Sequence, residues 1–288
     1  MVIERCSLIL DQLKFYKDEY ILENIISPYE MFILLVAIQI HDTGHLISTR
    51  ANHAKEGRRI LSAYDKSSRL SAAEKAIIGS IAQAHGGKDD PINKLEEKMH
   101  LSHKKIRPQF LAALLRLSDE LAEDETRASK ILLEMDQIVS TSKIFHLYSA
   151  SLNSIELSGK EISLNFYVTD KYLGEKFEKK INGKIIYQYL INEIYERSNK
   201  THLEALYCSR FLPEGCRFTK VRAKINLISS ESHGNIYPPI GFELIENGYP
   251  SYENKTVFEL CNSLWDSGIV NQGVKIDGLY VSNLLAKE

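Results

Sequence analysis

Apolar residues recur with helical spacing over roughly the first half of the chain. The uncharged run from Met31 to Ile40 predicts one buried helix. Pro108 opens another apolar segment, and we expect a helix from Gln109 to about Asp124. At the N-terminus, intervals of four, three and four predict one buried helical stripe, formed by Val2, Cys6, Ile9 and Leu13.

Capping signals indicate where two of these helices begin. Ser27 and Glu30 form a capping box with proline at the first helical position, and Ser71 and Glu74 form a second capping box. The helix that starts at Ser71 is expected to end at about His85, because the two following glycines readily take the left-handed conformation of a helix end. Short loops between such helices predict an all-α bundle.

Beyond about residue 140 the apolar pattern changes to a period of two. Segments 154–157 and 161–168 alternate around Ser158-Gly159-Lys160, which predicts a β-hairpin with one buried face. Residues 221–227 alternate in the same way and predict a further strand. We expect residues 171–199 to be helical, with an interruption near Asn182-Gly183.

These patterns predict a mainly α protein with a smaller α+β region. We expect a helical domain over residues 1–140, an α+β accessory domain over 141–230 and a C-terminal extension over 231–288. The basic stretch from Lys176 to Lys184 is expected to form a solvated helix face.

Charge and length narrow the class of protein. The chain has 288 residues, with 36 Lys and Arg against 38 Asp and Glu, for a net charge of −2. This balance disfavours a strongly basic nucleic-acid-binding domain. The run from Met31 to Ile40 is about half the ~20 residues that a membrane-spanning helix needs.

The N-terminal residues and the cysteines indicate the cellular compartment in which the protein is expected. Glu4 and Arg5 lie at the very start, which is not the pattern of a secretory signal. We therefore expect a cytoplasmic protein without a membrane partner. The cysteines are far apart and form no Cys-x-x-Cys pair, so we expect reduced thiols at Cys6, Cys208, Cys216 and Cys261.

Histidines and aspartates at four places in the helical half suggest a metal site. Imidazole and carboxylate together bind Mn, Fe, Co, Ni or Zn, and no thiolate is present to indicate a structural zinc site. Asp42 and Asp119 both lie in strongly apolar helices, where a carboxylate is costly unless a cation or hydrogen bonds compensate it. The four places are the run His41-Asp42-Thr43-Gly44-His45, His53, His85 and Asp119.

The order of these residues resembles the HD-domain metal-dependent phosphohydrolases over about residues 1–135. The resemblance rests on His-Asp, His, His and Asp in that order, with the last inside the run Leu-Leu-Arg-Leu-Ser-Asp-Glu-Leu at 114–121. The region 145–168 is similar to the β-rich extension of a bacterial subgroup, the HD-CE type, found near conflict and chaperone-like ATPase systems. The resemblance implies an HD-type helical bundle followed by a smaller α+β domain.

The resemblance also implies a cofactor, one or two divalent metal ions of the Mn, Mg, Fe, Co, Ni or Zn kind. His41, Asp42 and Asp119 would hold the first metal, and Asp42 could bridge to a second one. His53 and His85 match the second-metal or phosphate-facing histidines of the phosphodiesterase-like branch.

Catalytic and substrate-binding roles follow from the same resemblance. Asp42 and His53 would be catalytic: a water activated by the metal attacks phosphorus, and His53 protonates the leaving oxygen. His45 resembles the substrate-facing histidine of the dNTP triphosphohydrolase branch, and His85 would also face the substrate. Independently of the resemblance, Lys55, Arg58 and Arg59 could bind phosphate by charge-assisted contacts, although a solvated helix face is the more typical role of such residues.

The family's first histidine has no counterpart in this sequence, since no histidine precedes His41. Residues 2–5 resemble the continuation of the helix that carries it. We therefore expect that ligand either just upstream of Met1 or lost from the protein.

The expected function is metal-dependent hydrolysis of a phosphoester, in a nucleotide or cyclic nucleotide. Alternatives are a dNTP triphosphohydrolase, an HD nuclease, and an inactive HD fold that serves as a sensor or docking module. Expected partners are a small phosphorylated substrate, an ATPase or defence-system protein, and a second copy of the chain. Structural roles also stay open: a salt-bridged helix end at His41-Asp42, an Arg116–Asp119 ion pair, and a helix-capping His85.

Overall fold

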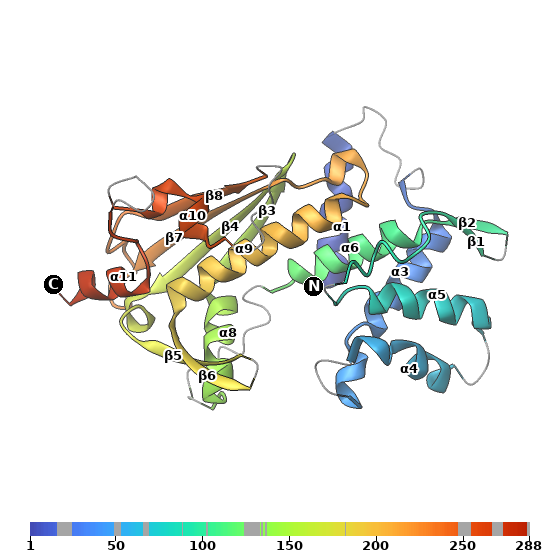
Figure 1. Cartoon of the computed structure of the whole chain (residues 1–288), viewed down its shortest axis with the longest axis horizontal. Helices are drawn as coiled ribbons and strands as arrows, with labels where there is room; N and C mark the ends of the chain where they lie inside the picture. Colours follow the sequence, from blue (N-terminus) through green and yellow to red (C-terminus); the bar gives the residue numbers. More distant parts are fainter. Residues whose placement is uncertain are drawn as a thin grey trace. The chain divides into compact units, whose positions relative to one another are not determined.

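The chain packs into two compact units in a computed structural model (Figure 1). The first comprises residues 1–122 and 207–217, and the second comprises residues 123–206 and 218–288. The three-part division predicted from the sequence stays a prediction, because packing alone does not define domains of common origin. The structure describes residues 1–15, 25–48, 53–65, 69–87, 89–101, 103–123, 133, 135, 137–181, 183–246, 255–266 and 273–286.

Helices make up most of the first unit. Both predicted capping boxes are present: Ser27 accepts from the backbone of Glu30, and Ser71 accepts from that of Glu74. The long helices are α1 (Val2–Asp11), α3 (Pro28–Ile40), α4 (Gly57–Tyr64), α5 (Ala72–Gln83) and α6 (Pro108–Glu120), with a small hairpin of β1 (Met99–Leu101) and β2 (Lys104–Ile106). Shorter 3-10 helices include η2 (Thr43–Leu46) and η3 (His53–Lys55).

Helix α6 is the centre of this unit, and α1, α3 and α5 all pack against it (Figure 1). Its residues from Phe110 to Leu115 are buried. An α-helix that is apolar on nearly all sides is typical of a core element surrounded by others. The three surrounding helices supply the apolar stripe opposite α6, including Ile9, Ile33 and Ile78, which are fully buried.

A buried ion pair joins the starts of α3 and α6. The carboxylate of Glu30 accepts from the Nε of Arg107 at 2.8 Å and from its Nη2 at 3.0 Å, and Glu30 is only 3% exposed. Each helix has 13 residues. Because both helices rise by about 1.5 Å per residue, a common start brings their far ends, at His41 and Asp119, to a similar level.

A four-stranded sheet forms the core of the second unit. Its order is β3-β4-β7-β8, and β4 and β7 are parallel while the other pairs are antiparallel. The predicted hairpin and the predicted strand at 221–227 are both confirmed. The bounds are β3 (Leu152–Ser158), β4 (Glu161–Thr169), β7 (Lys220–Ile228) and β8 (Ile240–Ile245).

The predicted helix over residues 171–199 is wrong in its first part. Residues 176–189 form an antiparallel hairpin of β5 (Lys176–Ile181) and β6 (Lys184–Tyr189), and the helix begins only at Leu190. The sequence Asn182-Gly183 is the dipeptide that two-residue hairpin turns favour, and Gly183 has a φ of +82°. Asn182 itself lies outside the described residues.

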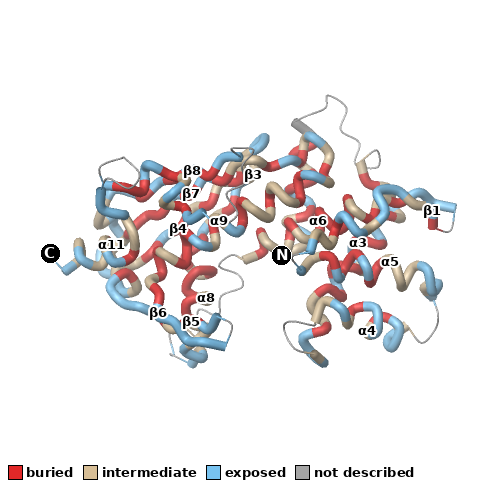
Figure 2. Tube along the Cα trace, viewed as in Figure 1, coloured by how far each residue is buried: buried red, intermediate tan, exposed pale blue. Residues whose placement is uncertain are grey.

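The basic stretch is therefore strand rather than a solvated helix face. Lys179 points inward and is buried, whereas four residues of β6, from Lys184 to Tyr187, are exposed (Figure 2). In a strand, neighbouring residues point to opposite faces, so adjacent lysines differ in exposure. A helix would have placed them on one solvated side.

Further helices complete the second unit: α8 (Ser140–Ser151), α9 (Leu190–Ser209), α10 (Val257–Leu260) and α11 (Gly278–Leu285). Helix α9 begins in the second unit, and its last residues, from Tyr207 on, belong to the first. The protein is mainly α with a smaller sheet region, as predicted. Among the described residues, no helix combines the length and the apolar character needed to cross a membrane.

Candidate metal centre

The ends of three helices of the first unit bring the predicted histidines and aspartates together. His41 is the C-cap residue of α3, and Asp42 is the N-cap residue of η2. His85 follows the end of α5, and Asp119 lies in the last turn of α6. The remaining two residues, His45 and His53, lie in the short helices η2 and η3.

Gly44 allows η2 and η3 to approach closely. A Cβ atom at Gly44 would lie 2.0 Å from the carbonyl oxygen of His53 and 2.6 Å from its carbonyl carbon. Contacts under 3.0 Å to backbone cannot be tolerated, so only glycine fits here. This glycine, two residues after Asp42, thus allows the close approach that brings His53 beside the His41-Asp42 pair.

Asp42 is the centre of the cluster. Its Oδ1 lies 3.4 Å from the Nε2 of His53 and 3.5 Å from the Nε2 of His85. The Nε2 of His45 is 3.8 Å from the same oxygen, and Oδ2 lies 3.5 Å from the Nε2 of His41. Four imidazoles from separate segments therefore face one carboxylate.

Backbone carbonyls orient two of these imidazoles. The Nδ1 of His41 lies 2.7 Å from the Ile38 carbonyl oxygen, and the Nδ1 of His85 lies 2.5 Å from that of Ala82. A ring that donates through Nδ1 presents an unprotonated Nε2 on its other side, which is the arrangement usual for metal-binding histidines. Both Nε2 atoms are among those that face Asp42.

The aromatic rings of the cluster also pack on one another. His45 and His53 are stacked with 3.9 Å between ring centroids, and His41 meets His85 edge-on at 5.0 Å. The Nε2 atoms of His53 and His85 are 3.1 Å apart. His45 remains the most open member, with 43% of its side chain exposed against 6% for His85.

Two buried atoms of the cluster have no hydrogen-bond partner among the described residues. They are the Nε2 of His41 and the Oδ1 of Asp119, which lie 3.4 Å apart without forming a hydrogen bond. An unsatisfied buried polar atom costs about 1–3 kcal/mol, so such atoms call for an explanation. A cation between them would satisfy both.

Opposite effects set the protonation of this pair. Burial favours the neutral imidazole of His41, but the neighbouring Asp119 carboxylate outweighs it and raises the pKa of His41. Burial also opposes ionisation of Asp119, yet His41 lowers its pKa below the ordinary value. The His85 imidazole is the main cause of a lowered pKa at Asp42. Both carboxylates are therefore held as anions, the form that binds metal.

The donor set fits one or two divalent metal ions. One group of possible ligands is His41, Asp42 and Asp119, and another is Asp42, His45 and His53. Within each group the ligand atoms lie within 4.8 Å of one another. The groups share Asp42, and together they offer nitrogen and carboxylate oxygen without a thiolate, which suits Mn, Fe, Co, Ni or Zn.

Other residues considered from the sequence lie apart from the cluster. Arg58 is exposed on α4, and its Cβ packs against Gly79 of α5. Arg116, considered above as an ion-pair partner of Asp119, donates from Nη1 to the carbonyl oxygens of Ala84 and Gly87. The histidines that stand outside the described cluster are His100, His103, His146, His202 and His233.

Sequence reasoning missed two long-range contacts that support the cluster. Neither the Glu30–Arg107 pair nor the bonds from Arg116 to the end of α5 could be predicted, because each joins residues at least 29 positions apart. The sequence of a helix predicts contacts only between side chains three or four residues apart.

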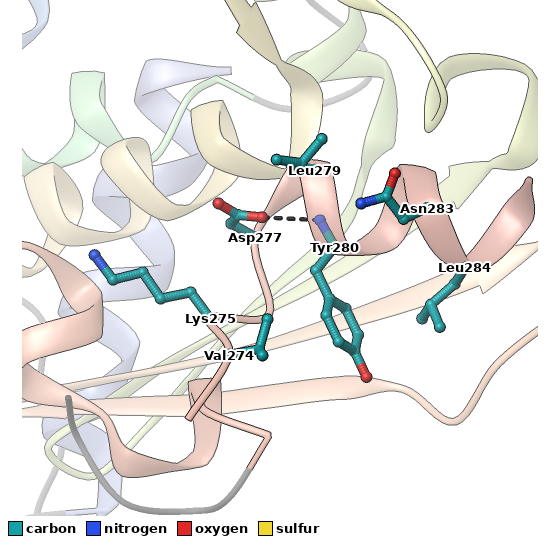
Figure 3. Close-up of a pocket in the computed structure, with 7 residues that line it drawn as sticks. All are labelled: Val274, Lys275, Asp277, Leu279, Tyr280, Asn283 and Leu284. Atoms are coloured by element: carbon teal, nitrogen blue, oxygen red, sulfur yellow. Dashed lines mark hydrogen bonds between the residues drawn. The ribbon is translucent and has the colours of Figure 1, made fainter. Parts of the chain in front are cut away.

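A separate pocket in the second unit offers no comparable chemistry (Figure 3). It has a volume of about 460 Å³ and lies along α11. Asp277 caps the helix by accepting from the backbone of Tyr280, and the ammonium group of Lys275 lies over the rings of Phe258 and Trp265. Its two charged groups are thus already engaged in local contacts.

Comparison with known proteins gives one positive result. No curated protein and no solved structure matches the chain. The model of the HD-CE family, however, matches residues 1–200, which include every residue of the cluster and the first hairpin of the accessory sheet. Because this match spans more than half of the 288 residues, the chain belongs to the HD-CE family.

Proposed function

We propose that this protein is a metal-dependent phosphohydrolase that cleaves a phosphoester, in a nucleotide or a cyclic nucleotide. The observation that carries the proposal is the pair formed by His41 Nε2 and Asp119 Oδ1. Both atoms are buried, unsatisfied and 3.4 Å apart, and both residues adjoin Asp42. An arrangement that costs stability without a cation is typical of a site that binds one.

The chain offers ligands for two metal ions with Asp42 between them. His41, Asp42 and Asp119 would hold the first, and Asp42, His45 and His53 the second, with His85 beside both. When bound, a divalent cation supplies Lewis acidity, which neutralises charge on phosphoryl oxygens and makes water a better nucleophile at neutral pH.

Protein side chains would carry out the proton transfer and the binding of the phosphate group. With one metal held by His41, Asp42 and Asp119, His53 would stay unligated; it is 15% exposed and carries its Nε2 3.4 Å from Asp42, so it can exchange a proton with a substrate oxygen that enters there. Imidazole is suited to this role because it gains and loses a proton near neutral pH. The exposed Arg58 would add a charge-assisted contact to a phosphate group.

Metal content and hydrolysis test the proposal together. Protein loaded with Mn²⁺ and desalted should retain metal by elemental analysis and hydrolyse members of a panel of phosphomonoesters, diesters and cyclic nucleotides. The variants His41→Ala and Asp42→Ala should lose both properties while helical content stays near wild type. His100→Ala, in an exposed position on β1, is the matched control and should keep both. Stoichiometric metal in both cluster variants would overturn the site assignment.

A specific observation favours one variant of this function. His45, the last residue of the run from His41, stacks on His53 and faces Asp42 at 3.8 Å, as a substrate-facing histidine would. A dNTP triphosphohydrolase would release inorganic triphosphate from a dNTP, and ³¹P NMR distinguishes this product from phosphate. Degradation of single-stranded DNA would instead indicate an HD nuclease. Protein without metal and without hydrolysis would indicate an inactive HD fold that serves as a sensor or docking module.

A further inference from the structure

His85 lies in the turn that follows α5, where its backbone N–H donates to the Ala82 carbonyl oxygen at 3.3 Å. It comes two residues after the end of α5, and two glycines follow it, of which Gly87 has a φ of +93°. The Ala82 carbonyl orients the His85 ring within this turn, but the glycines that follow allow many backbone conformations and do not by themselves fix the turn. The ring is nevertheless 6% exposed, with its Nε2 3.1 Å from that of His53.

Arg116 brackets this segment from the neighbouring helix. Its Nη1 donates to the carbonyl oxygen of Ala84 at 3.4 Å and to that of Gly87 at 3.1 Å. These carbonyls lie on either side of His85, and the first belongs to the C-cap of α5. The guanidinium group therefore satisfies the carbonyl of the C-cap residue, which a helix end leaves without an intrahelical partner, and a second carbonyl beyond His85.

Tyr207 holds the guanidinium in place. The Cζ of Arg116 lies 5.0 Å from the centroid of the Tyr207 ring, and the Cζ of Arg210 lies 5.5 Å from the same centroid. The hydroxyl of Tyr207 accepts from the backbone N–H of Ile92 at 3.0 Å, and Arg210 pairs with Asp90. The end of α9 thus supports both Arg116 and the chain that continues beyond His85.

We propose that Arg116 is the positioning residue for His85. It lies three residues before Asp119 on α6, so one helix supplies a candidate metal ligand and also fixes the histidine opposite Asp42. Its bonds go to backbone rather than to the imidazole, which places it outside the metal centre. The metal-binding consequence rests on the proposed function, whereas the placement of His85 does not.

The placement is tested in metal-free protein by NMR of the histidine rings. The His85 signals are assigned by their loss in His85→Gln. In Arg116→Gln we expect the His85 ring resonances to shift and the Gly86 amide to exchange at least tenfold faster, while the circular dichroism spectrum stays unchanged. Arg59→Gln removes an exposed arginine of α4 and should leave His85 as in wild type. Unchanged His85 resonances in folded Arg116→Gln would overturn the proposal.

Two further variants keep the test informative if Arg116→Gln fails to fold. Arg116→Lys retains a cation above Tyr207 but lacks the planar guanidinium, and should shift His85 less than Arg116→Gln does. Tyr207→Phe retains the ring but loses the hydroxyl that binds Ile92, and should leave His85 near its wild-type position. A shift in Tyr207→Phe as large as in the Arg116 variants would show a general role in loop folding and contradict a specific one for Arg116.

Calorimetric titration with Mn²⁺ adds the second readout. His85 lies beside both proposed metal positions, and loss of a residue that orients the surroundings of a metal site typically weakens metal binding 10- to 100-fold, so we expect about this loss in Arg116→Gln. If wild-type protein binds no Mn²⁺ while the NMR shifts occur, the proposed function fails and the positioning role stands. If wild type binds Mn²⁺ and Arg116→Gln matches it in affinity and in His85 resonances, the positioning role fails alone.

Discussion

The two units each bury a cluster of charged groups, and they satisfy them differently. In the second unit, the buried Glu193 accepts from Lys179 at 2.5 Å, from Arg197 at 3.1 Å and from Gln188 at 3.2 Å. Glu196 adds a second carboxylate at 2.7 Å from the Lys179 ammonium. Cations from the chain itself neutralise the acids, and no oxygen of Glu193 is among the unsatisfied atoms of the described residues.

In the cluster of the first unit, the carboxylates have other partners among the described residues. Asp42 and Asp119 face imidazoles, and two buried atoms of the cluster are left without a hydrogen bond by the described part of the chain. Arg116, the basic residue nearest in sequence to Asp119, donates to backbone carbonyls. In the described part of the chain, the buried oxygens of Glu193 are therefore hydrogen-bonded, whereas the first cluster keeps two buried atoms that are not, as the proposed metal site requires.

This difference separates the two clusters more sharply than burial does. Glu193 is more deeply buried than Asp119, with 1% of its side chain exposed against 24%. What distinguishes the two is whether oppositely charged groups of the chain satisfy the carboxylate. Substitutions that remove one acid from each cluster should therefore have opposite consequences for stability and for metal binding.

Glu193→Gln should have the largest effect on stability. It leaves Lys179 and Arg197 with less compensating charge in a buried setting, and breaking such a network costs about 3–5 kcal/mol. Urea unfolding of metal-free protein, followed by circular dichroism, measures the loss in free energy. Glu156→Gln, at an exposed position of β3, is the control and should change little. A loss below about 1 kcal/mol would show that the second cluster is not what stabilises its unit.

Gly44→Ala should have the second-largest effect on stability. The new Cβ would meet the His53 carbonyl at 2.0 Å, so η2 and η3 must separate at a cost of about 1–3 kcal/mol. The same movement displaces His53 from Asp42, and bound Mn²⁺ should fall measurably by elemental analysis. Gly241→Ala, where a Cβ would meet nothing within 4 Å, should leave stability and metal content unchanged. Full metal content in Gly44→Ala would contradict the importance of the close approach.

Asp119→Asn should have the opposite effects to Glu193→Gln, with little loss of stability and a large loss of bound metal. In metal-free protein the asparagine fills the same volume beside His41, and we expect stability to change by about 1 kcal/mol or less. Retained metal after Mn²⁺ loading should nevertheless be lost, because the amide carries no negative charge. A destabilisation as large as that of Glu193→Gln, measured in the same urea titration, would remove the contrast between the two clusters.

The smallest effect is expected for a substitution of His202, which should change how the stability of the protein depends on pH. Burial in α9 lowers its pKa, although a hydrogen bond to the Thr219 carbonyl opposes the shift. The unfolded chain then takes up a proton near pH 6.5 while the folded protein does not, so stability should fall as pH drops below about 6.5. In His202→Gln this part of the dependence should disappear. An equal slope in wild type and variant would exclude His202 as its source.

The sequence predicted those parts of the site that depend on local signals. Ser27 and Ser71 cap α3 and α5 as expected, because a capping box is complete within four residues. The candidate ligands from His41 to Asp119 were recognisable by their order, and the structure brings all of them together. Strand alternation likewise predicted β3, β4 and β7.

What the sequence did not predict depends on contacts between distant residues. The pattern of β5 and β6 favours helix and hairpin alike because lysines and isoleucines suit either structure, and the Asn-Gly dipeptide is the local signal that distinguishes them. The partners of Glu30 and Arg116 lie 77 and at least 29 positions away, respectively. Equally unexpected, residues 207–217 belong to the first unit, where Cys216 donates to the Ile9 carbonyl.

The return of residues 207–217 to the first unit has a consequence for biosynthesis. A chain that emerges from the ribosome in order presents α1 to α6 long before the segment that covers Ile9 and stacks on Arg116. Domains generally fold as units while the ribosome adds about 5–20 residues per second to the chain. The first unit can therefore reach its final packing only after residues 207–217 have been translated, and strands β3 to β6 of the second unit lie between α6 and this segment. Synthesis of β3 and β4, two strands of the four-stranded sheet, thus precedes completion of the first unit.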